Sequence, residues 1–256
     1  MLIRLGQTAT GQGVFLDPSA PRHTLLTGAT RSGKSTQLYG MLAQLKGLPV
    51  KVCGIDPSGI TLNALGDALG GNNWRVLTLR DPQKIERVIF EIVEEMDERI
   101  DGLLRGRMDK FTRFDSSRPL LVVVFEEYPG LLAALAALDQ ASGAKAGNRV
   151  ELKVRAAVQR LALEGAKVGV RLWMVAQRAD ASLLTGVLRS QLTQRLSFAQ
   201  DADGLRMLHE SVTPEQVQEA QRFKPGMGYA EFTGDIELTR YRADFIDYGE
   251  LLSVFR

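Results

Sequence analysis

Apolar residues along the chain recur in two spacings, which predict alternating strands and helices. Short continuous apolar runs at 24–27, 50–55, 74–79, 120–125 and 170–176 have the length of buried strands. Between them, apolar residues three and four positions apart predict helices. The longest covers residues 82–111, with its apolar face made by Ile85, Val88, Ile89, Ile92, Val93 and Met96. Uniformly apolar strands alternating with helices are typical of a parallel sheet covered on both faces, so the pattern predicts an α/β fold.

The two ends of the chain depart from this alternation and predict hairpins. Residues 1–21 alternate short apolar pieces with Gly, Asp and Pro, which indicates an N-terminal β-hairpin. A C-terminal hairpin is expected from 227–232 paired with 236–241. A small-residue helix over 131–138 and a helix over 150–164 flank a glycine-rich stretch, so 142–153 is interpreted as an inserted flexible loop. With no repeat or linker to divide it, residues 1–256 are expected to form a single domain.

Composition narrows the class of protein. The net charge is +2 over 256 residues, so any contact with nucleic acid must come from a local group of cations. The single cysteine, Cys53, lies in an apolar run and excludes a disulfide framework; a buried small hydrophobe is the simpler interpretation. The longest apolar run, 131–138, is far shorter than the roughly 20 residues that cross a bilayer. We therefore expect a cytoplasmic chain that reaches a membrane only through a partner.

The strongest chemical signal is Gly28-Ala29-Thr30-Arg31-Ser32-Gly33-Lys34-Ser35, which matches the phosphate-loop pattern G-x-x-x-x-G-K-[ST] between a predicted strand and a predicted helix. The glycines allow positive φ and close approach of main-chain N–H groups to phosphates. Lys34 is expected to contact the β and γ phosphates and Ser35 to bind Mg²⁺, and the site is expected to extend to Thr36. The pattern predicts binding of a nucleoside triphosphate with Mg²⁺.

Carboxylates end two of the predicted strands. Glu126 and Glu127 follow the apolar run at 120–125, where one can hold the water shell of Mg²⁺ and the other can orient or deprotonate the attacking water. We assign Glu126 to the metal and Glu127 to catalysis. Asp56 ends the run at 50–55 and is either a site residue or an Asp-Pro turn former. Gln177 ends the run at 170–176, where its amide can sense the γ phosphate. The charge run 91–99 is interpreted as a solvated helix face.

Six segments in order resemble the motor domain of the FtsK/SpoIIIE branch of the HerA/FtsK superfamily of DNA translocases. They are the approach to the phosphate loop at 5–30, Ile55-Asp56-Pro57, Glu95-Met96-Asp97-Glu98-Arg99, Phe125-Glu126-Glu127, Arg160-Leu161-Ala162 with Gly165 and Gly169, and Ala176-Gln177-Arg178. The match covers about residues 3–232. The resemblance implies a RecA-like core, a homo-oligomeric hexameric ring, and ATP-driven movement of double-stranded DNA. It also implies an arginine finger supplied by a neighbouring subunit.

Three departures from the family pattern affect the site. Glu126 stands where the family usually has Asp. The family's usual finger arginine falls at Ala166, so Arg160 or Lys167 substitutes for it, or hydrolysis is weak. The loop at 142–153 is longer than the family norm. It is either a surface loop or a pore-facing segment that contacts DNA phosphates through Lys145, Arg149 and Lys153.

Two functions follow from these features. The first is a DNA-stimulated ATPase that moves or transfers double-stranded DNA, with an origin on a plasmid, phage or integrated element expected because no membrane segment or sequence-reading domain accompanies it. The second is an ATP-binding coupling or assembly factor of a secretion or conjugation machine, with weak hydrolysis. A small-molecule kinase is a distant third, because it would leave Gln177-Arg178 and the long resemblance unexplained.

Overall fold

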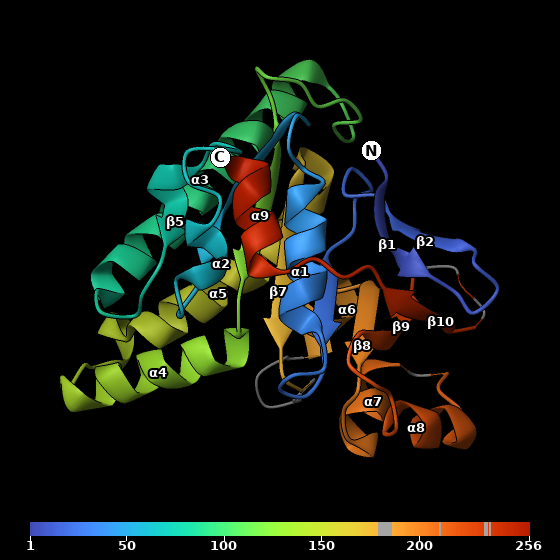
Figure 1. Cartoon of the computed structure of the whole chain (residues 1–256). Coiled ribbons are helices and arrows are strands. Elements are labelled where there is room, and N and C mark those ends of the chain that lie inside the picture. The colour runs from blue at the N-terminus through green and yellow to red at the C-terminus, as the bar shows by residue number, and fades with distance from the viewer. Residues whose placement is uncertain (179–185, 210, 233–234, 236) are drawn as a thin grey trace. The chain divides into compact units, whose positions relative to one another are not determined.

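The computed structural model describes residues 1–178, 186–209, 211–232, 235 and 237–256 (Figure 1), and its contacts divide the chain into two compact units. The first unit comprises 1–48 and 174–256, and the second comprises 49–173. β7 (Val170–Ala176) crosses the boundary between them. Of the predicted C-terminal hairpin, Ile236 lies outside the described residues.

The first unit has the strand order β2-β1-β10-β9-β8-β3. Its strands are β1 (Ile3–Gln7), β2 (Gly13–Leu16), β3 (Thr24–Thr27), β8 (Gln194–Phe198), β9 (Met227–Glu231) and β10 (Thr239–Ala243). β3 and β8 are parallel, whereas β1–β2 and β9–β10 are antiparallel. The hairpins predicted at the two ends of the chain are therefore confirmed, and the C-terminal one is joined to the N-terminal one by antiparallel pairing of β1 with β10.

Helices of the first unit are α1 (Lys34–Ala43), α6 (Gly186–Gln191), α7 (Ala202–Leu208), α8 (Pro214–Ala220) and α9 (Tyr248–Phe255). α1 and α9 lie side by side (Figure 1), where the rings of Tyr39 and Tyr248 are 5.9 Å apart and Lys46 donates to the Val254 carbonyl. A small apolar cluster fills the space between α7, α8 and β9; its members are Leu205, Val217, Ala220, Tyr229 and Leu238.

The second unit is a parallel α/β unit with strand order β6-β4-β5. Its strands are β4 (Val50–Ile55), β5 (Arg75–Val76) and β6 (Leu120–Phe125), and every residue of β6 is fully buried, as the continuous apolar run predicted. The helices are α2 (Ile60–Asn63), α3 (Pro82–Gly106), α4 (Tyr128–Ala141) and α5 (Val150–Glu164), with 3₁₀ turns η1 (Asn72–Trp74), η2 (Ala146–Asn148) and η3 (Gly165–Val168). The α/β class with a parallel core is confirmed.

The long helix α3 buries the six apolar residues predicted for its inner face and ends five residues earlier than expected. The charge run on α3 is only partly a solvated face, because the Arg99 side chain is 7% exposed. Arg99 pairs with Glu95 at 2.7 Å and donates to the Val168 carbonyl oxygen at 3.2 Å. A buried guanidinium is tolerated there because these acceptors replace its water.

The stretch predicted as a flexible loop at 142–153 is shorter in the structure. α4 continues to Ala141 and α5 begins at Val150, so residues 142–149 connect them and include η2. The buried Asp139 carboxylate accepts hydrogen bonds from the N–H groups of Val150 (3.0 Å) and Glu151 (2.9 Å), which fixes the start of α5. Positions 150–153 therefore belong to a helix.

Candidate nucleotide-binding site

The predicted phosphate loop links β3 to α1 in the first unit. Gly28 and Gly33 have φ values of 149° and 118°. A Cβ at Gly28 would lie 2.6 Å from the Ser32 Oγ, and one at Gly33 would lie 2.9 Å from the Gly226 nitrogen. Arg31 between them has a φ of 65°, a left-handed conformation that side chains rarely adopt. The main chain needs glycine at both positions where the motif specifies it.

Two hydrogen bonds anchor the loop to the sheet of the same unit. The Ala29 N–H donates to the Ala199 carbonyl oxygen just after β8 (2.7 Å), and the Gly226 N–H donates to the Ser32 carbonyl oxygen just before β9 (2.8 Å). Residues that are far apart in the sequence therefore hold the loop from two sides.

The first turn of α1 carries the polar groups that the motif predicts. The Lys34 ammonium donates to the carbonyl oxygens of Gly28 (2.5 Å) and Ala29 (3.0 Å), and the Thr36 hydroxyl donates to that of Gly33 (2.7 Å). Ser35 is exposed, and the first turn contains no acidic residue. Because the N-terminal end of a helix and a lysine both favour anions, this turn has the charge and the donors to bind phosphates.

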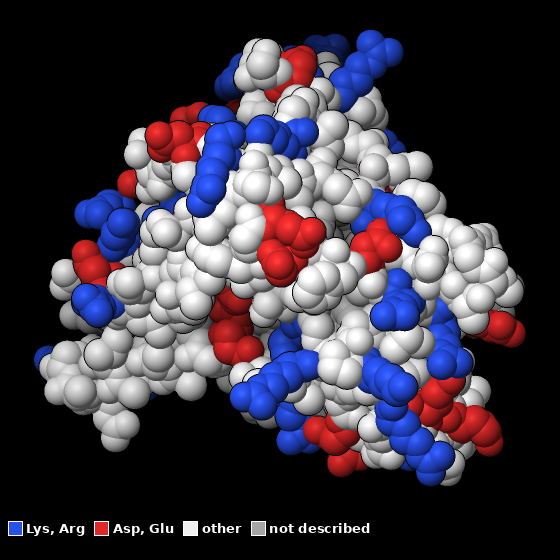
Figure 2. Space-filling view, viewed as in Figure 1, with Lys and Arg blue, Asp and Glu red and all other residues white. Residues whose placement is uncertain are grey.

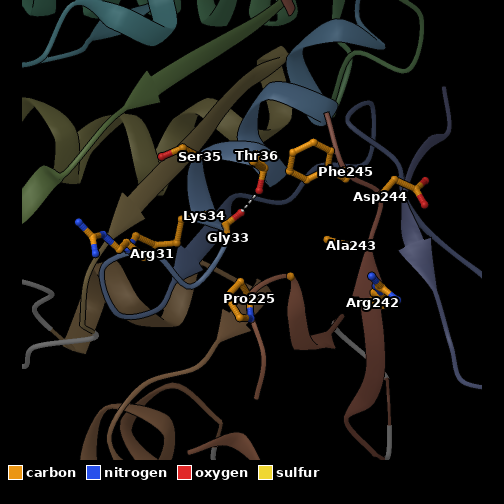
Figure 3. A pocket seen from close by; sticks show the side chains of 11 residues that line it. Arg31, Gly33, Lys34, Ser35, Thr36, Pro225, Arg242, Ala243, Asp244 and Phe245 are labelled. Atoms are coloured by element: carbon orange, nitrogen blue, oxygen red, sulfur yellow. Dashed lines mark hydrogen bonds between the residues drawn. The ribbon is translucent and has the colours of Figure 1, made fainter. Parts of the chain in front are cut away.

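A pocket of about 300 Å³ opens beside this turn (Figure 3). One side is formed by Arg31 and residues 33–36 of the phosphate loop and α1. The other side is formed by Pro225, Gly226 and residues 242–245. This second side was not predicted from the sequence; its only sequence signal is the Pro225-Gly226 pair, which is typical of a turn.

Gln177 and Arg178 follow β7 in the first unit, and both side chains are exposed. The Arg178 Nε lies 2.9 Å from the Oδ2 atom of Asp201. The Oδ1 atom of Asp201 accepts from the Gly204 N–H and so caps α7. Arg178 is thus held beside the start of α7. The role of Gln177 at the γ phosphate stays a prediction.

The predicted acidic pair lies in the second unit, directly after β6. Burial first of all, and then the nearby Asp56 carboxylate, raise the pKa of Glu126 to about 7. Glu127 is the N-cap residue of α4, and its φ of 55° places its main chain in the left-handed region, which is rare for a residue with a side chain. Strained conformations of this kind cluster at functional sites, which is consistent with a working role for Glu127.

Asp56 directly follows β4, which pairs with β6, and is fully buried. One of its oxygens accepts from the Ser58 N–H (3.0 Å), the Ser58 hydroxyl (2.7 Å) and the Gly59 N–H (2.9 Å), and the other accepts from the Leu62 N–H (3.0 Å). These four bonds shape the turn into α2. Of the two interpretations of Asp56, the structure thus gives it the role of a turn former, and its charge also acts on Glu126.

No group of three or more His, Cys, Asp or Glu residues within the described part of the chain is placed to hold a metal ion. Mg²⁺ in nucleotide sites needs fewer protein ligands, because phosphate oxygens and water complete its shell. The residues fit that pattern: the Oε2 atom of Glu126 is buried without a hydrogen-bond partner among the described residues, and the Ser35 hydroxyl is exposed. Ser35 and Glu126 belong to different units, and their sharing of one ion stays a prediction.

The two finger candidates differ in their surroundings. Arg160 on α5 donates to both oxygens of Asp97 (2.8 and 2.5 Å) and to both oxygens of Glu164 (3.1 and 3.0 Å). These hydrogen bonds, those to Asp97 first, raise the pKa of Arg160. Lys167 lies in η3 with its side chain exposed. Arg160 therefore links α5 to α3, and with it two of the segments that resemble the family.

The three residues predicted to contact DNA also differ in their surroundings. Lys145 and Arg149 lie in the exposed connection between α4 and α5, whereas Lys153 lies on α5 and pairs with Glu86 at 2.6 Å. Elsewhere, Figure 2 shows Lys and Arg side chains mixed with Asp and Glu over α7, α8 and β10. There Arg240 pairs with Glu219 at 2.6 Å.

No helix among the described residues has the length and hydropathy to cross a bilayer.

Comparison with known proteins identifies the family. The model of the FtsK/SpoIIIE family matches residues 1–227. The DNA translocase FtsK of Bacillus cereus is 27% identical over 217 residues, and the DNA translocase SpoIIIE of Bacillus subtilis is 25% identical over 217 residues. Each alignment covers 78% of this chain and 25% of the relative, so the chain spans about a quarter of the length of these relatives.

Solved structures with similar folds include the pCW3 conjugation coupling protein TcpA with ATPγS and the cytoplasmic domain of the secretion ATPase EccC of Thermomonospora curvata. The match to TcpA has a TM-score of 0.70 at 19% identity and covers 100% of this chain and 70% of the TcpA chain. The match to EccC has a TM-score of 0.73 at 21% identity and covers 99% of this chain and 30% of the EccC chain. These likenesses show the fold. The chain belongs to the FtsK/SpoIIIE family and has the fold of its P-loop ATPases.

Proposed function

We propose that this chain is the motor part of a DNA translocase, which hydrolyses ATP to move double-stranded DNA and works as a ring of identical subunits. The observation that supports it most is the phosphate loop, whose glycines, lysine and helix N-terminus have the geometry that binding of a triphosphate requires. Membership of a family whose matched relatives are named DNA translocases supports DNA as the substrate.

In this proposal the residues act as follows. Lys34 leaves the two loop carbonyls to bind phosphate oxygens, and the N–H groups of the loop and α1 bind the rest. Ser35 and Glu126 would hold Mg²⁺, which would neutralise phosphate charge when bound. Glu127 orients the attacking water or takes its proton, and the Gln177 amide senses the γ phosphate. The strained φ of Glu127 supports a carboxylate aimed by the main chain.

DNA contact is proposed for the α4–α5 connection, through Lys145 and Arg149. Cations on a glycine-containing segment suit contact with the phosphate backbone, which is independent of sequence. Neutralising Lys145 and Arg149 together should lower the salt dependence of DNA binding, whereas Lys153→Gln, which changes a cation already paired with Glu86, should change it little. An unchanged slope in the double variant would instead make the connection a surface loop.

The decisive experiment is steady-state ATP hydrolysis with and without duplex DNA. Wild-type protein should be stimulated by DNA, Lys34→Ala should lose ATP binding, and Glu127→Gln should bind ATP but lose DNA-stimulated turnover. Glu98→Gln, the same change on the exposed side of α3, is the matched control. Electron microscopy with duplex DNA and a slowly hydrolysed ATP analogue tests the ring.

A coupling or assembly factor with weak hydrolysis is the second candidate, favoured by one observation. Arg160, one of the two finger candidates, is occupied by two carboxylates, and the other candidate is a lysine. ATP binding with no response to DNA would support this function. TcpA, named a conjugation coupling protein, and EccC, named a secretion ATPase, have folds of this kind. An origin on a mobile element stays a prediction.

A further inference from the structure

The pocket beside the phosphate loop contains one feature that phosphate binding does not explain. Phe245 lines it with its side chain 77% exposed, a larger exposed fraction than that of any other large hydrophobic residue in the described part of the chain. In Figure 3 its ring lies beside Thr36 in the first turn of α1. An aromatic ring left in water next to a site for anions indicates a ligand with both an anionic and a flat apolar part.

The segment that carries Phe245 is fixed relative to the phosphate loop by main-chain hydrogen bonds within the same unit. The Gly226 N–H donates to the Ser32 carbonyl oxygen (2.8 Å), and the Ala243 N–H donates to the Gly226 carbonyl oxygen (2.8 Å). Two bonds therefore connect the loop to residue 243, two positions before the ring. These bonds fix the main chain at residue 243 relative to the phosphate loop, as a preorganised site requires.

A second set of contacts fixes Asp244 on the other side. Its N–H donates to the Leu5 carbonyl oxygen at 3.1 Å, and its carboxylate lies 3.1 Å from the Arg4 guanidinium. The N–H groups of residues 226, 243 and 244 are thus all used inside the protein. A ligand can therefore contact this side of the pocket only through side chains. Among residues 242–245, Phe245 has the apolar side chain with a flat face.

We propose that Phe245 is the platform on which the base of the bound nucleoside triphosphate stacks. This inference rests on the nucleotide binding proposed above and adds the residue that holds the base end of the ligand. In this proposal the phosphates bind at the loop and the first turn of α1, and the base lies on the side of the pocket formed by residues 242–245. Stacking uses the face of the base, so Phe245 adds affinity for the nucleotide and none for the phosphates alone.

Binding of two probes measured by calorimetry separates the base from the phosphates: Mg²⁺-ATP, and Mg²⁺-tripolyphosphate, which has no base. Phe245→Ala should weaken ATP binding by roughly tenfold and leave tripolyphosphate binding unchanged, because base–aromatic stacking is lost and the loop is intact. Phe245→Trp keeps a flat ring and should bind ATP within about threefold of wild type. Phe15→Ala, a change at a 47% exposed ring on β2, is the matched control and should leave both affinities unchanged.

The outcomes distinguish this proposal from the one on which it rests. Equal ATP affinity in wild type and Phe245→Ala, with binding lost in Lys34→Ala, would overturn the platform and leave the phosphate site standing. Loss of oligomers in Phe245→Ala without a change in ATP affinity would also overturn it, since the ring would then belong to a subunit contact. Normal ATP binding by Lys34→Ala would instead refute the nucleotide site itself.

Discussion

Replacing Glu126 with Gln should make the nucleotide-free protein more stable at neutral and alkaline pH. Glu126 directly follows the buried strand β6, its Oε2 atom has no hydrogen-bond partner among the described residues, and Asp56 and Glu127 add negative charge nearby. Burial and the Asp56 charge raise its pKa to about 7, so the folded protein favours the neutral form. Gln keeps the shape of that neutral form and never ionises.

The size and the sign follow from linkage. A carboxyl whose pKa is 4.5 in the unfolded chain and about 7 in the folded one binds its proton more tightly when folded. Stability is therefore lost as the pH rises from 4.5 to 7, and the full cost of the ionised form, about 3 kcal/mol, is present above pH 7. The stability advantage of Glu126→Gln should grow by about 2 to 3 kcal/mol between pH 5 and pH 8.

Urea unfolding followed by circular dichroism, at pH 5 and pH 8 with EDTA and without nucleotide, measures this difference. Glu98→Gln, which removes the same charge from an exposed position on α3, is the control. If the free energy of unfolding of Glu126→Gln differs from that of the wild type by the same amount at pH 5 and at pH 8, the reasoning is refuted. The carboxylate would then be no harder to ionise in the folded protein than in the unfolded one. The variant should also lose ATP hydrolysis, so that one substitution trades activity for stability.

Three further predictions follow from single contacts. A Cβ at Gly54, whose φ is 127°, would lie 1.9 Å from the Val124 carbonyl oxygen, so Gly54→Ala should lose more than about 3 kcal/mol of stability in a thermal melt. Gly147 has open space around it, so Gly147→Ala is the control and should melt like the wild type. Arg160→Gln should cost about 0.5 to 1 kcal/mol in a thermal melt, since its ion pairs are half exposed, and leave kcat unchanged; a tenfold fall in kcat at unchanged stability would make it the finger. His209 is fully buried, and burial lowers its pKa, so stability should fall as the pH drops through 6.5; His209→Gln should show a smaller fall between pH 7 and pH 5 in urea titrations.

The parts of the fold that local sequence determines were predictable. β4, β6 and β7 have the predicted bounds because a continuous apolar run can only be buried on both faces, and α5 has its predicted limits, 150–164. The phosphate loop could be placed because the glycines at 28 and 33 are required by the path of the main chain itself. Each of these signals lies within a few residues of the feature it predicts.

What escaped prediction depends on contacts between distant segments. The burial of Arg99 requires the Val168 carbonyl, 69 residues away, and the fork of Arg160 requires Asp97, 63 residues away. The side of the pocket formed by residues 225–226 and 242–245 exists because β9 and β10 pair with each other and Gly226 bonds to the phosphate loop. Periodicity and composition do not determine which remote carbonyl or carboxylate a side chain meets.

The surroundings of Arg160 bear on which proposed function holds. A finger must approach the γ phosphate of a neighbouring subunit, which carries several negative charges. Arg160 is bonded to two carboxylates, so the three side chains together carry a net charge of −1 and repel a triphosphate. Releasing the guanidinium would also leave the Asp97 and Glu164 carboxylates without this cation. Lys167 is exposed and has no such neighbours among the ion pairs of the described residues, but an ammonium cannot bond two oxygens as a fork. If Lys167 acts in trans, hydrolysis should be slower than with an arginine. A slow ATPase that DNA still stimulates would then fit the motor better than the switch.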